Sequence, residues 1–133
     1  MAELIDAVRN RLEGPNLWHV ATINPDGSPQ VTPMWADLRG GRILLNTAKG
    51  RKKHRNMGND PRVAVSSSST ADFPLDVAIQ GRIVESYDGE QAERDIDALA
   101  KKYLDADSYP FRRLGEERVS FLVEPLHVWT LAR

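Results

Sequence analysis

Hydrophobic residues follow two different periods along this chain of 133 residues. Where they recur every three to four positions, they predict amphipathic helices over residues 3–13 and 88–104. Gly14 and Pro15 end the first of these helices. Elsewhere, alternating or short apolar runs lie between turn residues and predict strands. The expected strands are residues 17–23, 30–38, 42–47, 62–66, 75–84 and 118–130.

Glycines and prolines indicate how these strands connect. Gly40 and Gly41 are typical of a two-residue hairpin, and the connections between the first three strands are too short for the crossover helices of a parallel sheet. Pro33 cannot donate to a ladder, so it marks an edge, a bulge or a strand that faces a ligand. Gly81 predicts a bulge in a long, bent strand. We expect an α+β fold: a small β-barrel of six antiparallel strands with flanking helices, as one domain over residues 1–133.

Composition excludes several classes of function. Hydrophobic residues make up 41% of the chain and charged residues 28%, which is typical of a globular protein. The absence of cysteine excludes disulfides and thiolate metal sites. The three histidines lack metal-ligand spacing, so no metal is expected. No apolar run approaches the ~18 residues of a transmembrane helix, and the acidic start does not resemble a signal peptide. These features predict a cytoplasmic protein that does not bind membranes.

Positive charge is concentrated in one short segment. Five of the 18 Lys and Arg residues lie between Lys49 and Arg55, which we call the basic segment. No Asp or Glu occurs between Asp37 and Asp60 to neutralise it. The rest of the chain has 13 basic and 19 acidic residues, a net charge of −6. One positive spot on an acidic chain favours a defined anionic ligand over a long polyanion such as nucleic acid.

The surroundings of the basic segment resemble an anion site. A short strand precedes it, Gly50 permits a sharp turn, and the residues up to Gly58 permit two helical turns. A strand, a glycine turn and a basic helix start would place free backbone N–H groups beside cationic side chains. The alternative is a solvated basic helix face. A second polar run, from Ser67 to Thr70, has no glycine nearby and is expected to be a solvated loop.

Several motifs occur along the chain in a fixed order. They are PQVTPMW at 29–35, residues 47–54, DPRVAV at 60–65, Gln80-Gly81 and PLHVW at 125–129. In this order they resemble the motifs of the split β-barrel flavoproteins related to pyridoxamine 5′-phosphate oxidase. The basic run most resembles the small actinobacterial oxidoreductases that use the deazaflavin coenzyme F420. The resemblance covers nearly the whole chain.

The resemblance implies a homodimer with two cofactor sites at the subunit interface, and it assigns residues to each site. The phosphate of the cofactor is expected on Thr47, Arg51, Lys52 and Lys53. The edge of its ring is expected against Thr32, Pro33, Met34 and Trp35.

Other matches to the family are looser. Trp129 matches a position near the cofactor or the interface, although a core or dimer tryptophan is an equal alternative. Asp76 loosely matches a polar cofactor contact, and His127 is expected to be structural. The chain ends at Arg133, without the Arg- and His-bearing tail of pyridoxamine phosphate oxidases, so that activity is not expected.

These observations predict an oxidoreductase that transfers hydride from reduced coenzyme F420 to a small electron-poor organic substrate. Lys49 and Arg55 favour the deazaflavin, whose polyglutamate tail needs more positive charge than one phosphate. The alternatives are an FMN-binding flavin oxidoreductase of the same fold, a non-catalytic ligand- or phosphate-binding module, and a haem-binding barrel with His19 or His127 as ligand. No paired carboxylates or Ser-His-Asp set occurs, so no catalytic acid or base is predicted.

Overall fold

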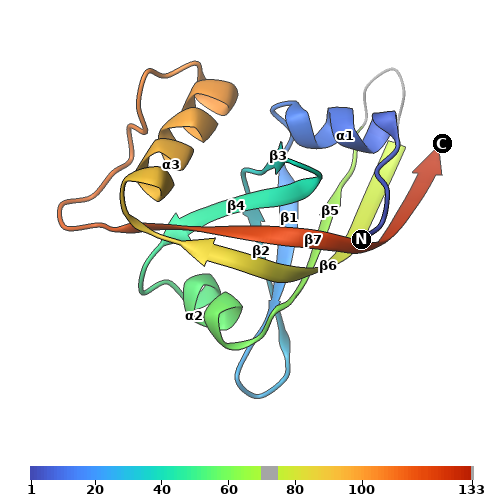
Figure 1. The fold of residues 1–133 in the computed structure, drawn as a ribbon, viewed down its shortest axis with the longest axis horizontal. Coiled ribbons are helices and arrows are strands. Elements are labelled where there is room, and N and C mark those ends of the chain that lie inside the picture. Colours follow the sequence, from blue (N-terminus) through green and yellow to red (C-terminus); the bar gives the residue numbers. More distant parts are fainter. Residues whose placement is uncertain (70–74, 133) are drawn as a thin grey trace.

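The computed structural model describes residues 1–69 and 75–132, which form an antiparallel sheet with helices around it (Figure 1). The strands in this part of the chain are β1 (Trp18–Ile23), β2 (Pro29–Met34), β3 (Asp37–Arg39), β4 (Arg42–Ala48), β5 (Arg62–Ser67), β6 (Leu75–Tyr87) and β7 (Arg118–Ala132). The helices are α1 (Asp6–Glu13), α2 (Lys52–Asn59) and α3 (Gly89–Leu104).

The strand order explains why the sheet curls. The strands are hydrogen-bonded in the order β2-β1-β5-β6-β7-β4-β3, and every neighbouring pair is antiparallel. The two edge strands, β2 and β3, are separated in sequence by Trp35 and Ala36 only. A link this short spans at most about 11 Å, so the two edges of the sheet come close together. Among the described residues no ladder joins β2 to β3, and the result is an open barrel in an α+β fold.

The prediction of six strands was wrong, because residues 30–38 form two strands. The chain leaves the β1 side of the sheet at Met34 and joins the β4 side at Asp37. Side chains of α3 replace the ladder at the break: the Ala36 N–H donates to the Tyr103 hydroxyl at 3.0 Å, and Lys102 Nζ donates to the Ala36 carbonyl at 2.5 Å. These partners lie far away in sequence, so the local apolar pattern does not reveal the break.

The predictions based on glycine and proline are confirmed. Pro33 lies on the edge strand β2. Gly40 and Gly41 have φ values of 57° and 81° and form the turn of the β3–β4 hairpin, which suits a turn with positive φ at both positions. The β6–β7 register shifts after Gln80, at the expected bulge. The expectation of a solvated loop from Ser67 onward was wrong at its first residue, because Ser67 is the last residue of β5 and is 4% exposed. Thr70 lies outside the described residues.

The helices cover different parts of the sheet (Figure 1). α1 contacts β3, α2 contacts β1 and β4, and α3 contacts β7 and β4. α1 begins at Asp6 rather than residue 3, and Ile5, expected on its apolar face, is 60% exposed. α3 has the expected extent, with Ala92, Ile96 and Leu99 buried. None of the helices in the described residues is long and apolar enough to cross a membrane.

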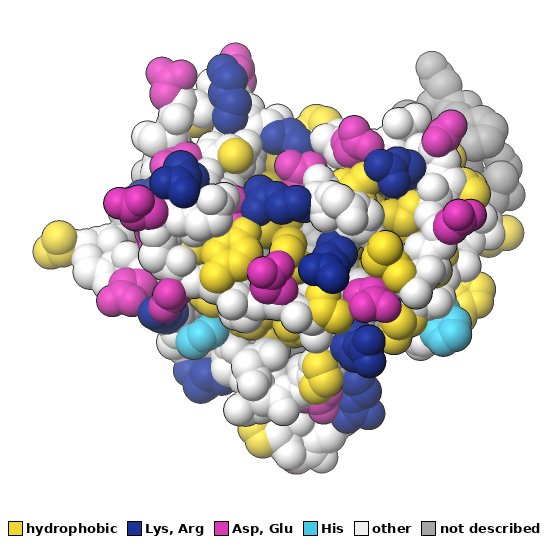
Figure 2. Space-filling model, viewed as in Figure 1, with side chains coloured by type: hydrophobic (Ala, Val, Ile, Leu, Met, Phe, Trp, Pro, Cys, Tyr) yellow, Lys and Arg dark blue, Asp and Glu magenta, His cyan; other side chains and the backbone are white. Residues whose placement is uncertain are grey.

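The buried core consists of large apolar side chains, and the visible surface carries charges of both signs. The largest fully buried side chains of the core include Trp18, Leu12 and Ile43. On the face shown in Figure 2, acidic and basic side chains are interspersed around exposed hydrophobic groups. That face therefore carries no continuous basic band of the kind that tracks a nucleic-acid backbone.

Candidate functional site

A cavity of about 140 Å³ lies where the first turn of α2 meets the ends of β2 and β4. α3 and the connection from α3 to β7 (residues 105–117) close its other sides. Six of the nine residues expected at the cofactor site line this cavity. They are Pro33, Met34 and Trp35 from the second strand and its exit, Thr47 from β4, and Arg51 and Lys53 from the basic segment. The structure therefore brings together two segments that the family resemblance assigned to one site.

The basic segment forms the expected turn and helix start. Gly50 has φ of 89°, a conformation that favours glycine, and its N–H donates to His54 Nδ1 at 3.0 Å. This bond needs a neutral imidazole, and partial burial and the charges of Lys49 and Arg55 lower the pKa of His54. The N-cap residue Arg51 makes no side-chain cap. The first N–H groups of α2 therefore retain capacity to bind an anion.

Cationic side chains converge on the cavity. Arg51, Lys53 and Arg118 all line it. Burial lowers the pKa of Lys53, and the charges of Arg51 and Arg118 lower it further. Within the described part of the chain Lys53 has no ion-pair partner, whereas Glu116 pairs with both arginines. Three cations and one carboxylate leave the cavity positively charged.

Thr47 supplies an independent sign of a ligand. Its side chain is 1% exposed, it lines the cavity, and its Oγ1 has no hydrogen-bond partner among the described residues. A buried hydroxyl without a partner costs about 1–3 kcal/mol, so such groups are rare unless something else satisfies them. A phosphate or ring oxygen of a ligand in this cavity would satisfy Thr47. The residues present therefore fit an anionic cofactor.

The side of the cavity facing α3 is aromatic. Trp35 stacks on Tyr103 with ring centroids 5.1 Å apart and an angle of 11° between the planes. Tyr109 meets Trp35 edge-on at 6.0 Å, and Phe111 meets Tyr109 in the same way at 5.8 Å. A cationic end and an aromatic end in one cavity suit a ligand with an anionic group and a flat ring.

Comparison with known proteins agrees with this geometry. The sequence model of the family described as pyridoxamine 5′-phosphate oxidase matches residues 4–132. The chain belongs to this family. The expected resemblance to split-barrel flavin and deazaflavin oxidoreductases is thereby confirmed. No curated protein matches this sequence significantly.

Solved structures share the fold of this family member over nearly its whole length. An F420 reductase is 25% identical, with a TM-score of 0.80 over 95% of this chain and 98% of its own. A conserved hypothetical protein from Mycobacterium tuberculosis is 22% identical, with a TM-score of 0.77 over 98% and 86% of the two chains. A FAD-binding protein from Mesorhizobium loti is 19% identical, with a TM-score of 0.67 over 98% and 96%. The last two comparisons show the fold alone.

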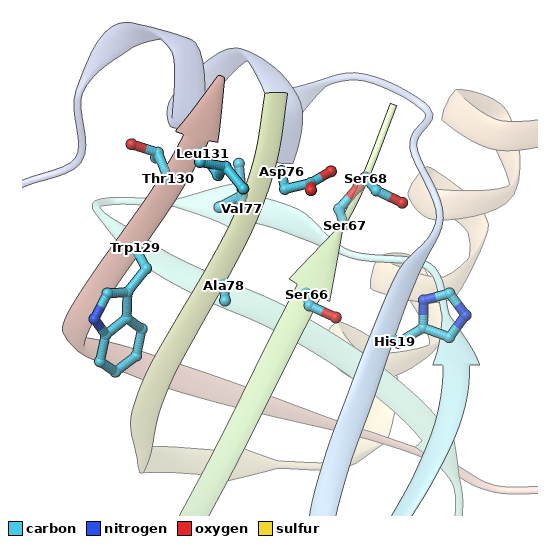
Figure 3. A pocket seen from close by; sticks show the side chains of 10 residues that line it. All are labelled: His19, Ser66, Ser67, Ser68, Asp76, Val77, Ala78, Trp129, Thr130 and Leu131. Carbon is cyan, nitrogen blue, oxygen red and sulfur yellow. The ribbon is translucent and has the colours of Figure 1, made fainter. Parts of the chain in front are cut away.

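Three expected site residues of this family member lie outside the cavity. Thr32 lies earlier on β2, and Lys52 is exposed on α2 near Asp26. Trp129 is 53% exposed on the outer face of β7, where it lines a different cavity of about 420 Å³. Figure 3 shows the side chains that line this second cavity, which come mainly from β1, β5, β6 and β7, with His19 and Trp129 on opposite sides.

The second cavity is larger, but its chemistry is different. Ser66 and Ala78 lie between the two rings, and Asp76 lies nearer the top of the view (Figure 3). Its described lining includes no lysine or arginine. His127 lies beside Trp129 with ring centroids 6.1 Å apart, and both His19 and His127 are exposed. Within the described residues no group of three His, Asp or Glu side chains could hold a metal. The smaller cavity is therefore the better candidate for an anionic cofactor.

Sequence reasoning missed the polar residues behind the cavity. Arg118 Nε donates to Asn46 Oδ1 at 2.9 Å, and Asn46 Nδ2 donates to Ser120 Oγ at 2.9 Å. Ser120 Oγ in turn donates to Asp95 Oδ2 at 2.7 Å, and Asp95 is 1% exposed. Asp95 lies next to Ile96 on the apolar side of α3, and an acidic residue at such a position is a sequence signal for a buried polar network. Nothing in the local sequence connects Arg118 or Asn46 to that position.

Proposed function

We propose that this family member is an oxidoreductase that uses coenzyme F420 and acts on a small electron-poor organic substrate. When bound, the reduced deazaflavin supplies the hydride. The observation that carries the proposal is the cavity itself, where Arg51, Lys53 and the unpartnered Thr47 hydroxyl lie opposite an aromatic wall. The similarity to an F420 reductase supports the same cofactor.

In this proposal the protein binds and orients the cofactor. Arg51, Lys53 and the first N–H groups of α2 hold its phosphate, and Thr47 Oγ1 forms a hydrogen bond with it. The exit of β2, from Pro33 to Trp35, lies against the ring. Among the strands that the structure describes, β2 pairs with β1 alone, so the backbone groups on its other edge are available to polar atoms of the ring. Trp35 and Met34 supply apolar contact and exclude water.

FMN is the alternative cofactor, and one observation favours it. Lys49 was expected to face the polyglutamate tail of the deazaflavin, but Lys49 Nζ pairs with Asp88 at 2.5 Å and with Glu117 at 2.9 Å. Arg55 is also engaged, because it donates to the Gly50 carbonyl. The charge beyond a single phosphate is therefore smaller than the sequence indicates. A non-catalytic phosphate-binding module would use the same cations but would have no need of the aromatic wall.

We further propose that the protein acts as a homodimer. The cavity of about 140 Å³ is smaller than the roughly 300 Å³ of common small-molecule sites, so one subunit encloses only part of a cofactor. On the outer face of the sheet, Ala21, Ala64 and Ala78 line an open depression of about 220 Å³ between Val31, which is 62% exposed, and Trp129. Such an apolar face is suited to a second copy of the chain. We expect Ala78→Asp to give a monomer by sedimentation and to weaken cofactor binding; an Ala78→Asp dimer with unchanged affinity would contradict this assignment.

The decisive experiment is a fluorescence titration of the purified apo-protein with coenzyme F420, FMN and riboflavin. We expect micromolar or tighter binding of F420, weaker binding of FMN, and the weakest binding of riboflavin, which lacks the phosphate. Tighter binding of FMN than of F420 would assign the protein to the flavin oxidoreductases. Binding of none of the three would refute the redox function.

A further inference from the structure

Arg118 is an unexpected member of the cavity lining. It is the first residue of β7, and it is 3% exposed although it lines the cavity. We propose that Arg118 is a further anion-binding residue of this site, and that Glu116 is an internal carboxylate which is exchanged for an anionic group of the ligand. The inference rests on the proposed function, since it concerns the same cavity.

The side chain of Arg118 is fixed in place but still has donors to offer. Its Nε donates to Asn46 at 2.9 Å and its Nη1 donates to Glu116 Oε1 at 2.5 Å, and its guanidinium carbon lies 5.0 Å from the Tyr109 ring centroid. A guanidinium carries five N–H donors and never loses its charge in proteins. Two hydrogen bonds leave donors for a ligand on a residue that already lines the cavity.

The orientation of Asn46 explains why Arg118 stays at the cavity. The Asn46 amide nitrogen donates to the Ala92 carbonyl at 3.0 Å and to Ser120 Oγ at 2.9 Å. Ser120 can accept this bond because its own proton goes to the Asp95 carboxylate. The amide nitrogen is therefore fixed toward α3, and the amide oxygen is fixed toward Arg118. The buried carboxylate thus sets the direction of the whole chain of bonds.

Glu116 occupies the place where an anion of the ligand would bind. Its side chain is 7% exposed and lies between two cavity-lining arginines, with Oε1 2.5 Å from Arg118 Nη1 and 3.7 Å from Arg51 Nη2. Burial raises the pKa of Glu116, but hydrogen bonds from the Arg113 N–H and from Arg118 outweigh it, and the pKa lies below its usual value. Glu116 is therefore a charged carboxylate at neutral pH. A phosphate or carboxylate of the ligand offers the same two oxygens to the same arginines.

This exchange predicts effects of opposite sign for the two partners. We would measure the affinity of wild type, Arg118→Gln, Glu116→Gln and Arg113→Gln for coenzyme F420, FMN and riboflavin. Arg118→Gln should weaken binding of the two phosphate-bearing ligands roughly tenfold or more. Glu116→Gln should strengthen it several-fold, because the competing carboxylate is gone. Arg113 is an exposed neighbour on the same connection, and its variant should bind like wild type. Riboflavin should bind equally to all four proteins.

A purely structural ion pair predicts a different pattern, in which Glu116→Gln and Arg118→Gln both destabilise the fold and both weaken binding. Weaker binding by Glu116→Gln, or full affinity in Arg118→Gln, would overturn the inference. If Arg118→Gln does not fold, Arg118→Lys keeps the charge without the forked donors, and it should bind the phosphate-bearing ligands with intermediate affinity; wild-type affinity in that variant also counts against the role.

A separate probe distinguishes failure of this inference from failure of the proposed function. If wild type binds neither F420 nor FMN, the redox function fails, and inorganic phosphate becomes the test ligand. Phosphate should then raise the unfolding temperature of wild type, raise that of Glu116→Gln more, and leave that of Arg118→Gln unchanged. Equal shifts in all three proteins would show that Arg118 and Glu116 take no part in anion binding.

Discussion

Replacing Lys53 by methionine should weaken cofactor binding and stabilise the ligand-free protein. Methionine has nearly the length and helix propensity of lysine, so the variant removes a charge with little change of shape. Burial and the charges of Arg51 and Arg118 lower the pKa of Lys53 in the folded chain. The folded state then binds this proton less tightly than the unfolded state does, so the charged lysine reduces stability at neutral pH. A ligand anion is the partner that reverses this effect.

The expected size of the binding effect follows from the bond that is lost. A hydrogen bond between charged groups contributes about 1.5–3 kcal/mol, which corresponds to a roughly ten- to hundredfold change in Kd. Lys52 is the matched control, since it is adjacent, equally charged, exposed and outside the cavity. An exposed cation contributes about 0.2–1 kcal/mol, so Lys52→Met should change Kd no more than about fivefold.

The assay is the fluorescence titration with coenzyme F420 and FMN, together with thermal unfolding of the ligand-free proteins. We expect Lys53→Met to unfold at a higher temperature than wild type and to bind both ligands more weakly, and Lys52→Met to resemble wild type in unfolding. Equal losses of affinity in the two variants would show that general surface charge, rather than the cavity, attracts the ligand. A lower unfolding temperature for Lys53→Met would refute the argument about its burial.

Three further predictions concern stability. Thr47→Val removes the unpartnered hydroxyl, so it should raise the free energy of unfolding by about 1 kcal/mol in denaturant titrations and lower ligand affinity by a similar amount. Burial raises the pKa of Asp95, but hydrogen bonds led by that from Arg39 bring it below the usual value. The stability that the Asp95 carboxylate confers is therefore present above about pH 4 and is lost as the pH falls further. Asp95→Asn should lower the free energy of unfolding by about 1.5–3 kcal/mol at pH 7, and the variant should lose less stability in acid than wild type does. Gly81→Ala would place Cβ 2.4 Å from Val123 Cγ1 and 2.8 Å from the Glu124 carbonyl, so chemical unfolding should show a loss of about 1–3 kcal/mol; unchanged stability would mean that the bulge can relax.

Local features of the fold were predictable because their causes are local. The hairpin at Gly40-Gly41 and the turn at Gly50 follow from the positive φ that glycine adopts readily. The bulge at Gly81 follows from the absence of a side chain where the backbone of β7 approaches closely. The break after Trp35 was not predictable. It depends on hydrogen bonds that Tyr103 and Lys102 make to Ala36 from almost 70 residues away.

The residues of the candidate site likewise divide into those that the sequence predicted and those that it did not. The basic segment is contiguous, so its charge and its turn were visible in the sequence. Its meeting with Pro33 to Trp35 came from the family resemblance, because no periodicity brings β2 close to α2. Arg118 was missed because a residue at the start of a strand carries no sign of the cavity it lines. Its partner Asn46 is 72 positions away in sequence.

The connection formed by residues 105–117 has a consequence for how such proteins diverge. It contributes Tyr109 and Phe111 to the cavity wall, yet it belongs to none of the strands or helices and adds no side chain to the buried hydrophobic core of the described residues. The side chain of Glu116 is buried and paired, but changes at exposed positions such as Phe111 alter the ligand environment at little cost in folding free energy. The barrel can therefore be inherited unchanged while this one connection is varied, which makes it the natural place for libraries aimed at new substrates.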